Sequence, residues 1–240
     1  MKKYTFLSFI LFLLFTNTNA QVKNLPDFFN KTDKFLSTYV KTGNVNYKSI
    51  YTGKTKLDEL VSFAAGKQNF SSSSEEKAFY LNTYNLMVIK GIINVYPTKG
   101  PMKTAGFFDK KTFTVNGATV TLNGIENDIV RKKYNDARIH FALVCGAKSC
   151  PPIQSYAFRP DKLDAQLETL TKQSIQDKSF TRVNNKTGKP SVSMIFNWYK
   201  EDFIKAKGSV VNFLNAYLKA PLPSSSQVEY YTYDWALNGQ

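Results

Sequence analysis

The sequence predicts an α+β fold in which one central buried helix packs against a small, mainly antiparallel sheet and peripheral helices. Residues 77–96 are apolar on nearly every side until Pro97 ends the run, as expected for a buried helix. Alternating segments flank Asn116 and Gly117, which is a strong signal for a β-hairpin. Because strands and helices are mixed and hairpins are present, α+β is favoured over a doubly wound parallel sheet.

Residues 1–20 have the pattern of a signal peptide. Lys2 and Lys3 precede an apolar run at residues 6–15, and Ala20 offers a small residue at the cleavage site. A membrane-spanning helix needs roughly 20 apolar residues, about twice the length of this run. We therefore expect cleavage near Ala20, a periplasmic or secreted protein, and no transmembrane anchor in the mature chain.

Residues 21–240 are expected to form a single globular domain. The chain is 42% hydrophobic, which provides a core, and no repeat or long linker divides it. The formal net charge is +14, but the lysines are scattered and form no basic stripe. We therefore expect a basic surface rather than a nucleic-acid partner. The sequence leaves the partner and the oligomeric state open.

The segment before the central helix is expected to be mainly helical. Residues 26–40 and 56–65 have the spacing of amphipathic helices, and Gly66 is a natural stop for the second. Residues 44–51, between them, form either a connection or a brief strand.

The central helix has a clear start signal, because Ser73 and Glu76 have the spacing of a capping box. One narrow side of this helix is polar, and we expect it to face solvent. The residues on that side are Thr83, Lys90 and Asn94.

Two asparagines, Asn82 and Asn85, lie away from this polar side, among apolar residues. A buried amide without hydrogen-bond partners costs about 1–3 kcal/mol, so both side chains should find partners. They either bind neighbouring backbone and lock the packing, or form part of a catalytic cluster.

The next predicted elements are a hairpin over residues 113–122 and a capped helix over residues 121–131. The helix is expected to turn its apolar side chains inward, namely Ile125, Ile129 and Val130. Glu126 and Arg131 on the same helix are candidate pocket residues, although each alone would also suit a solvated face.

The C-terminal part is expected to alternate helices and strands in the same way. Its predicted elements are a helix over residues 159–175, a hairpin of residues 180–183 and 191–195, helices over 197–203 and 210–218 interrupted at Gly208, and a final strand within 228–235.

Residues 138–152 hold the only histidine, His140, and both cysteines, Cys145 and Cys150. A strand-like apolar run, residues 139–144, ends in a loop that contains Gly146 and is closed by two prolines. Reactive side chains at the end of a buried strand are a common way to build a site. We therefore expect the function to depend on this stretch.

The two cysteines allow two states. An exported protein favours a disulfide bond, and this one would close a very small loop and affect local geometry more than stability. Two free thiols, one of them functional, are the alternative.

A thiol with an imidazole predicts a cysteine nucleophile, Cys145, activated by a histidine base, His140. Asn82 and Asn85 would then orient the imidazole or stabilise an oxyanion. Geometry opposes this, because a continuous strand would separate the two Cα atoms by ~16–17 Å and place the side chains on opposite faces. Cys150, on the returning loop, is a second thiol that could approach His140. Alternatively, His140 is structural and Cys145 is a small buried hydrophobe.

The same residues carry only a weak metal signal. The paired Cys-x-x-Cys spacing of zinc sites is absent, and the spacing of Cys145 and Cys150 also differs from thioredoxin-type motifs. We expect no metal and no cofactor.

Four segments together resemble the family known as domain of unknown function 547. They are residues 78–85, 122–126, 138–152 and 197–203, and the resemblance covers residues 73–218. The combination of Asn-x-Tyr-Asn with His-Phe-Ala-Leu-x-Cys-Gly is fairly specific. The family has no established activity to carry over. Some relatives have serine in place of Cys150, which implies that the family fold does not require a disulfide.

Two functions remain. The first is a non-catalytic exported binding or scaffold module, in which a polar cluster of His140, Cys145, Asn82 and Asn85 holds the fold. The second is a periplasmic cysteine-dependent hydrolase or acyltransferase that uses Cys145 and His140. The sequence decides neither whether the protein is an enzyme nor what it binds.

Overall fold

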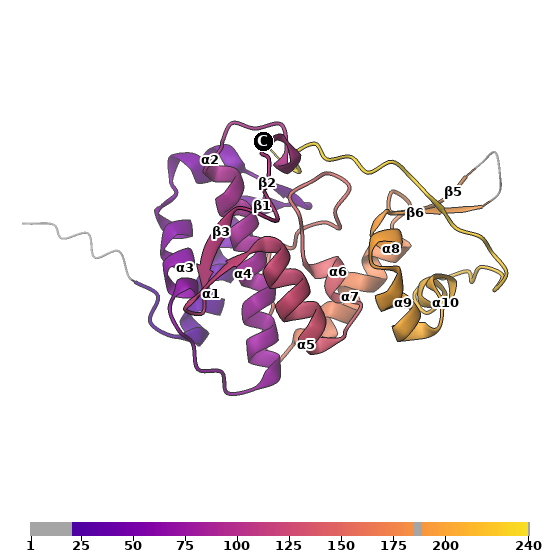
Figure 1. Cartoon of the computed structure of the whole chain (residues 1–240), viewed down its shortest axis with the longest axis horizontal. Coiled ribbons are helices and arrows are strands. Elements are labelled where there is room, and N and C mark those ends of the chain that lie inside the picture. Colours follow the sequence, from indigo (N-terminus) through magenta and orange to yellow (C-terminus); the bar gives the residue numbers. More distant parts are fainter. Residues whose placement is uncertain (1–20, 185–188, 240) are drawn as a thin grey trace, which may run out of the picture.

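The computed structural model describes residues 21–184 and 189–239 (Figure 1). The expected signal peptide, residues 1–20, lies outside the described residues. Within the described ranges, no helix is both long enough and apolar enough to cross a membrane.

Helix α4, Ser73–Ile93, runs through the middle of the molecule and confirms the predicted buried helix (Figure 1). Its N-cap is Ser72, whose hydroxyl accepts a hydrogen bond from the backbone N–H of Glu75 at 3.1 Å. The predicted capping box is therefore one residue too late, because the serine run offers several similar caps. The helix also ends before the predicted Tyr96, since the residue before a proline disfavours helical backbone.

The predicted solvent face of α4 is wrong over part of its length. Thr83 is fully buried, and Lys90 is partly covered. Helix α3, Thr55–Ala65, packs against α4, and Lys90 Nζ lies 2.6 Å from Asp58 Oδ1 of α3. This polar stripe therefore faces a neighbouring helix, and Asn94 at its end is exposed.

The elements before α4 confirm both predicted N-terminal helices, and Gly66 caps α3 as expected. The segment over residues 44–51 is a brief strand followed by a short helix. In order, these elements are α1 Leu25–Tyr39, β1 Val40–Lys41, β2 Asn44–Val45, α2 Tyr47–Thr52 and α3.

Strands β3, Thr112–Val115, and β4, Ala118–Thr121, form the predicted hairpin. Asn116 and Gly117 make its turn with φ angles of 50° and 77°. A short helix, η1 Pro101–Lys103, precedes this hairpin. The left-handed backbone explains why this pair of residues predicted the turn correctly.

The predicted helix after this hairpin is a π-helix, η2 Gly124–Arg131, which continues into α5 Lys132–Tyr134. Ile125 and Val130 point inward as predicted, whereas Ile129 is half-buried. Such π-turns are rare and often occur at functional sites. Here the turn carries Glu126 into a buried position.

The strand predicted at residues 139–144 is wrong. Ile139–Ala142 forms a short helix, α6, and the chain becomes extended only at Leu143. Tertiary contacts override the apolar strand-like pattern, because Asn85 of α4 accepts from the N–H of Val144 and donates to the carbonyl of Ala142. This arrangement ends the helical turn at Ala142.

The remaining elements follow the predicted order. They are α7 Leu163–Gln176, β5 Thr181–Val183, β6 Pro190–Val192, α8 Ile195–Trp198, α9 Lys200–Lys207, α10 Val210–Asn215 and β7 Glu229–Tyr230. Gly208 separates α9 from α10 with a φ angle of 79°. The predicted final strand is shortened to two residues, and the middle of the second hairpin, residues 185–188, lies outside the described ranges.

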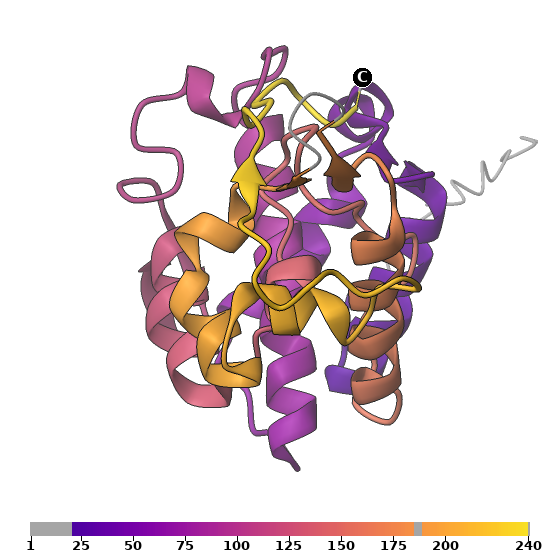
Figure 2. The same cartoon turned by 90° about the vertical axis from the view of Figure 1, so that its right-hand side faces the viewer.

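The α+β class is confirmed, although the strands of the described residues form three small sheets rather than one. All pairings between named strands are antiparallel except that of β6 with β7. The C-terminal segment, yellow in Figure 2, runs over the face formed by α8, α9 and α10 and returns to the neighbourhood of α2 (Figure 1). One hydrophobic cluster connects the N-terminal helices, α4 and the C-terminal helices.

Candidate functional site

The loop after α6 is fixed by α4 on one side and by the C-terminal segment on the other. Gly146 has a φ angle of 80°, and a Cβ there would lie 2.7 Å from Ile92 Cδ1 of α4. The N–H of Asn238 donates to the carbonyl of Gly146 at 3.0 Å, and that of Lys148 donates to the carbonyl of Ala236 at 2.8 Å. The close approach requires glycine, and it brings the end of the chain to the reactive stretch.

Asn82 and Asn85 both bind backbone, which is one of the two alternatives from the sequence. Asn85 donates to the carbonyl of Ala142 and accepts from the N–H of Val144, each at 2.9 Å. Asn82 makes the same pair of contacts, at 2.9 Å each, with the N–H and carbonyl of Phe158. The two amides thus hold the reactive stretch and its continuation against α4.

A cavity of about 270 Å³ lies beside α6, and we call it the His140 cavity. Its lining brings together His140, both cysteines and Glu126 with six further aromatic side chains. The lining residues are Tyr84, Met102, Phe108, Asn123, Glu126, His140, Leu143, Cys145, Cys150, Ile195, Trp198, Tyr199, Tyr233 and Trp235. Asn82 and Asn85 are not among them.

His140 is buried and held by Asp202 of α9. The imidazole Nε2 lies 2.7 Å from Asp202 Oδ2, and Arg131 binds the same carboxylate through Nε at 2.8 Å and Nη2 at 3.0 Å. Burial disfavours the charge of Asp202, but the hydrogen bonds from His140 and Arg131 outweigh it and lower the pKa well below its usual value. Because an ionised carboxylate only accepts, Nε2 of His140 carries the proton.

The other ring nitrogen of His140, Nδ1, is buried and has no hydrogen-bond partner among the described residues. In the neutral imidazole with its proton on Nε2, Nδ1 is an acceptor. Tyr199 stacks on the ring with the centroids 3.9 Å apart, and the Arg131 guanidinium lies 4.9 Å from the Tyr199 ring on which it packs. The imidazole is therefore fixed in orientation while its acceptor nitrogen has no partner among the described residues.

Glu126 is the second buried polar group of the cavity. Its Oε2 accepts a hydrogen bond from the Tyr84 hydroxyl at 3.0 Å. Burial raises the pKa of the Tyr84 and Tyr199 hydroxyls, and the nearby charge of Glu126 raises it further. Both tyrosines therefore stay protonated and can donate to this carboxylate.

Cys145 and Cys150 are joined by a disulfide bond in the cavity wall. The Tyr233 hydroxyl lies 3.1 Å from Cys150 Sγ and 3.3 Å from Cys145 Sγ. In this state Cys145 is not a free nucleophile. A continuous strand would have kept His140 and Cys145 too far apart to act together. The helical turn of α6 replaces that strand, and both residues line one cavity.

Aromatic rings form the outer wall of the cavity. Trp198 and Tyr233 have their ring centroids 4.8 Å apart, as do Tyr233 and Trp235. Trp198 is 44% exposed, which is unusual for so large an apolar side chain. The wall therefore reaches the protein surface and provides an entrance to the buried polar groups.

From the sequence, Glu126 and Arg131 were each predicted only as candidate pocket residues, without partners. Asp202 and Tyr199 were not predicted as site residues. The available signal was the segment at residues 197–203, which carries both of these residues and was noted only for its resemblance. Their roles depend on tertiary contacts of Tyr199 and Asp202 with His140 and Arg131, which the spacing of residues in the sequence does not reveal.

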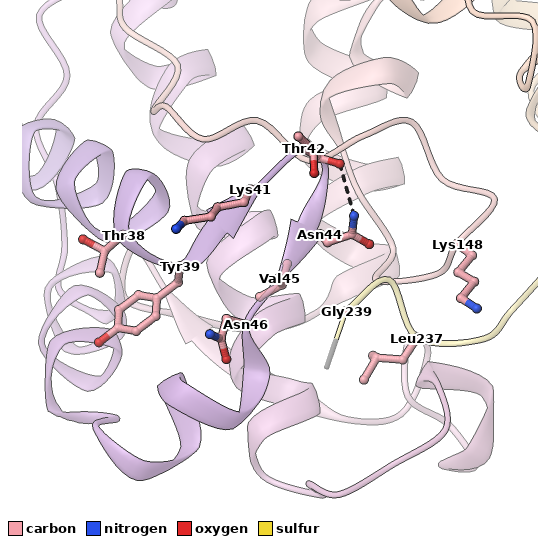
Figure 3. A pocket seen from close by; sticks show the side chains of 10 residues that line it. All are labelled: Thr38, Tyr39, Lys41, Thr42, Asn44, Val45, Asn46, Lys148, Leu237 and Gly239. Atoms are coloured by element: carbon pink, nitrogen blue, oxygen red, sulfur yellow. Dashed lines mark hydrogen bonds between the residues drawn. The ribbon is translucent and has the colours of Figure 1, made fainter.

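A larger cavity of about 580 Å³ lies between the end of α1, the β1–β2 hairpin and the C-terminal segment (Figure 3). Most of its lining side chains are exposed. Figure 3 shows Lys41 and Lys148 at opposite sides of it, with their amino groups apart. We prefer the smaller His140 cavity because buried polar groups converge there.

No three His, Cys, Asp or Glu side chains within residues 21–184 and 189–239 are grouped so that they could hold a metal ion.

The fold and the site together define an α+β domain with a small cavity lined by aromatic and polar groups. Residues 68–175 match the family described as "Protein of unknown function, DUF547". No curated protein and no solved structure matches the chain. The family match includes Glu126, His140 and both cysteines. It ends before Tyr199 and Asp202, so the cavity is completed by residues outside the matched segment.

Proposed function

We propose that this protein is an exported ligand-binding domain and that the His140 cavity is its binding site. The observation that carries the proposal is that Nδ1 of His140 has no hydrogen-bond partner among the described residues, whereas Nε2 of the same ring is bonded to Asp202. A buried polar atom without a partner costs about 1–3 kcal/mol, and a ligand donor at Nδ1 would remove that cost. Native proteins hold few such atoms, and of the six among the described residues, His140 Nδ1 is the one whose residue lines the His140 cavity.

The surrounding groups support binding of a small molecule. The cavity combines a mostly aromatic wall with a few buried polar groups, which is the usual composition of ligand sites. The backbone clamps of Asn82 and Asn85 keep the site formed before a ligand arrives, which limits the entropic cost of binding.

A fragment screen by ligand-observed NMR tests this function. Asn123 is exposed on the cavity lining, so Asn123→Trp should fill the entrance without disturbing the core. We expect fragments to bind the unmodified protein and to lose binding in this variant. Asn94→Trp, at the exposed end of α4, is the control. Equal binding to all three proteins, or no binding fragments, would contradict the proposal.

Export is the second part of the proposal and depends on the N-terminal pattern alone. Mass spectrometry of protein purified from its native host should find Gln21 as the first residue, and cell fractionation should find the protein outside the cytoplasm. Intact Met1 in protein from the cytoplasmic fraction would rule out export.

A cysteine-dependent hydrolase or acyltransferase is the second candidate, because Cys145 and His140 line one cavity and Asp202 leaves Nδ1 free as an acceptor. A dithiol would first reduce the disulfide, giving two thiols and the oxidised reductant. Cys145 would then pass its proton to His140 and attack an ester carbonyl. The imidazolium returns this proton to the departing alcohol and a thioester is left. Water then attacks the thioester, which releases the acid and restores the Cys145 thiol.

Hydrolysis of a chromogenic acetate ester after treatment with dithiothreitol tests the second candidate. It predicts turnover in the reduced protein that is absent from the oxidised protein and from reduced Cys145→Ser, whereas reduced Cys150→Ser stays active. Activity that survives in reduced Cys145→Ser would eliminate it.

A further inference from the structure

We propose that the ligand of the His140 cavity is a small organic ammonium ion that carries N–H bonds. This inference rests on the proposed binding function and adds the chemical class of the ligand. The charge of the cavity, its aromatic rings and its hydrogen-bond acceptors support this ligand class.

The His140 cavity differs in charge from the rest of the protein. The chain has a formal net charge of +14, yet the cavity is lined by one carboxylate, that of Glu126, and by no described lysine or arginine. The nearest cation of the histidine network, Arg131, is neutralised by the bidentate contact with Asp202. The cavity therefore favours a positive ligand, and it would exclude anions that the protein surface attracts.

The aromatic wall of the cavity also favours an organic cation. Trp198, Tyr233 and Trp235 are packed at the cavity entrance with neighbouring centroids 4.8–5.8 Å apart. The faces of such rings attract ammonium groups, and the attraction grows when water is excluded. An opening lined by rings beside a buried carboxylate can select an organic cation over a hydrated metal ion, which does not give up its water shell to rings.

The hydrogen-bond acceptors of the cavity favour a ligand that carries N–H donors. In the neutral imidazole, His140 Nδ1 is an acceptor that has no partner among the described residues. The Glu126 carboxylate accepts from the Tyr84 and Tyr199 hydroxyls and has lone pairs left for a further donor. An ammonium group with several N–H bonds is a donor only and can satisfy such acceptors. A quaternary ammonium ion carries the same charge and has no donor, so it should bind less tightly.

Three probes of similar shape separate charge from donation: benzylammonium, benzyl alcohol and benzyltrimethylammonium. Benzylammonium has both features, the alcohol has only the donor, and the quaternary ion has only the charge. Isothermal titration calorimetry on the unmodified protein at neutral pH should give benzylammonium at least about tenfold higher affinity than either of the others. This comparison requires no variant to fold.

Glu126→Gln should remove most of the preference for benzylammonium over benzyl alcohol. Glu59→Gln on α3, outside the cavity, should keep it. Equal affinity for the ammonium and the alcohol, or no binding of benzylammonium, would overturn this inference. Neutral fragments that still compete for the cavity in that case would leave the binding function standing, whereas absence of all binding would remove both.

Discussion

Nε2 of His140 lies 2.7 Å from Oδ2 of Asp202, and this contact determines what the imidazole offers to the cavity. Arg131 keeps Asp202 ionised, so Nε2 is the donor, and in the neutral ring Nδ1 is an acceptor without a partner among the described residues. Under the proposed function, Nδ1 is the atom that a donor on the ligand would satisfy.

We predict that the neutral His140 ring carries its proton on Nε2. We expect ¹⁵N-edited NMR to show a proton on Nε2 that exchanges slowly with water, because it is buried and bonded to a carboxylate. Asp202→Asn should speed this exchange, whereas Asp128→Asn on the exposed side of η2 should not. A proton on Nδ1 in the unmodified protein would contradict the account.

Asn85 is predicted to act by positioning the backbone. Asn85→Ala leaves the buried carbonyl of Ala142 and N–H of Val144 without partners, so urea unfolding should show a loss of about 2–4 kcal/mol. Asn94→Ala, at the exposed end of the same helix, should stay within about 0.5 kcal/mol of the unmodified protein. A stable Asn85→Ala protein that has lost ligand binding would instead assign Asn85 to the site itself.

Asp136 is predicted to make stability depend on acid. Burial opposes its charge, but hydrogen bonds from Arg138 and the charge of Lys77 outweigh burial and lower the pKa to about 2, from 3.8. Because the folded pKa is the lower one, its contribution of about 2 kcal/mol is complete above pH ~4 and is lost as the pH falls toward 2.

Urea unfolding of the unmodified protein and of Asp136→Asn between pH 7 and pH 2.5 measures this contribution. The difference in unfolding free energy should be constant at neutral pH and shrink in acid. Asp109→Asn at the surface is the control. A difference that does not change with pH would refute the role of Asp136.

The disulfide is predicted to be present in the exported protein and to contribute modestly to stability. Peptide mapping without reductant should recover Cys145 and Cys150 in one linked peptide. Since the loop is short, Cys150→Ser should lose no more than about 2 kcal/mol of unfolding free energy. Dithiothreitol should lower the stability of the unmodified protein but not that of the double variant Cys145→Ser, Cys150→Ser. Two alkylatable thiols in protein freshly purified without reductant would contradict the prediction.

The sequence predicted the elements that local rules determine. Asn116 and Gly117 made their turn as expected, Gly66 and Gly208 ended helices, and the buried character of α4 followed from its composition. It failed at residues 139–144, where an apolar run typical of a strand forms a helical turn. Asn85, more than fifty residues earlier, supplies the hydrogen bonds that decide this conformation.

The sequence indicated where the candidate site lies in the chain, but not which side chains contact one another there. His140, Cys145 and Cys150 do line one cavity, whereas Asn82 and Asn85 bind backbone behind it. The two residues that hold the imidazole, Asp202 and Tyr199, lie some sixty residues further along the chain. Only the tertiary fold brings them to the imidazole, so no spacing rule could have found them.

The ¹⁵N resonance of His140 Nδ1 during a titration with benzylammonium is the most direct test of the central claim. We predict that it moves as a donor reaches this nitrogen, with the same midpoint as the change in Trp198 fluorescence, isolated by comparison with a Trp235→Phe protein. A ligand that saturates the protein while the Nδ1 resonance stays fixed would show that binding occurs elsewhere and would contradict the account.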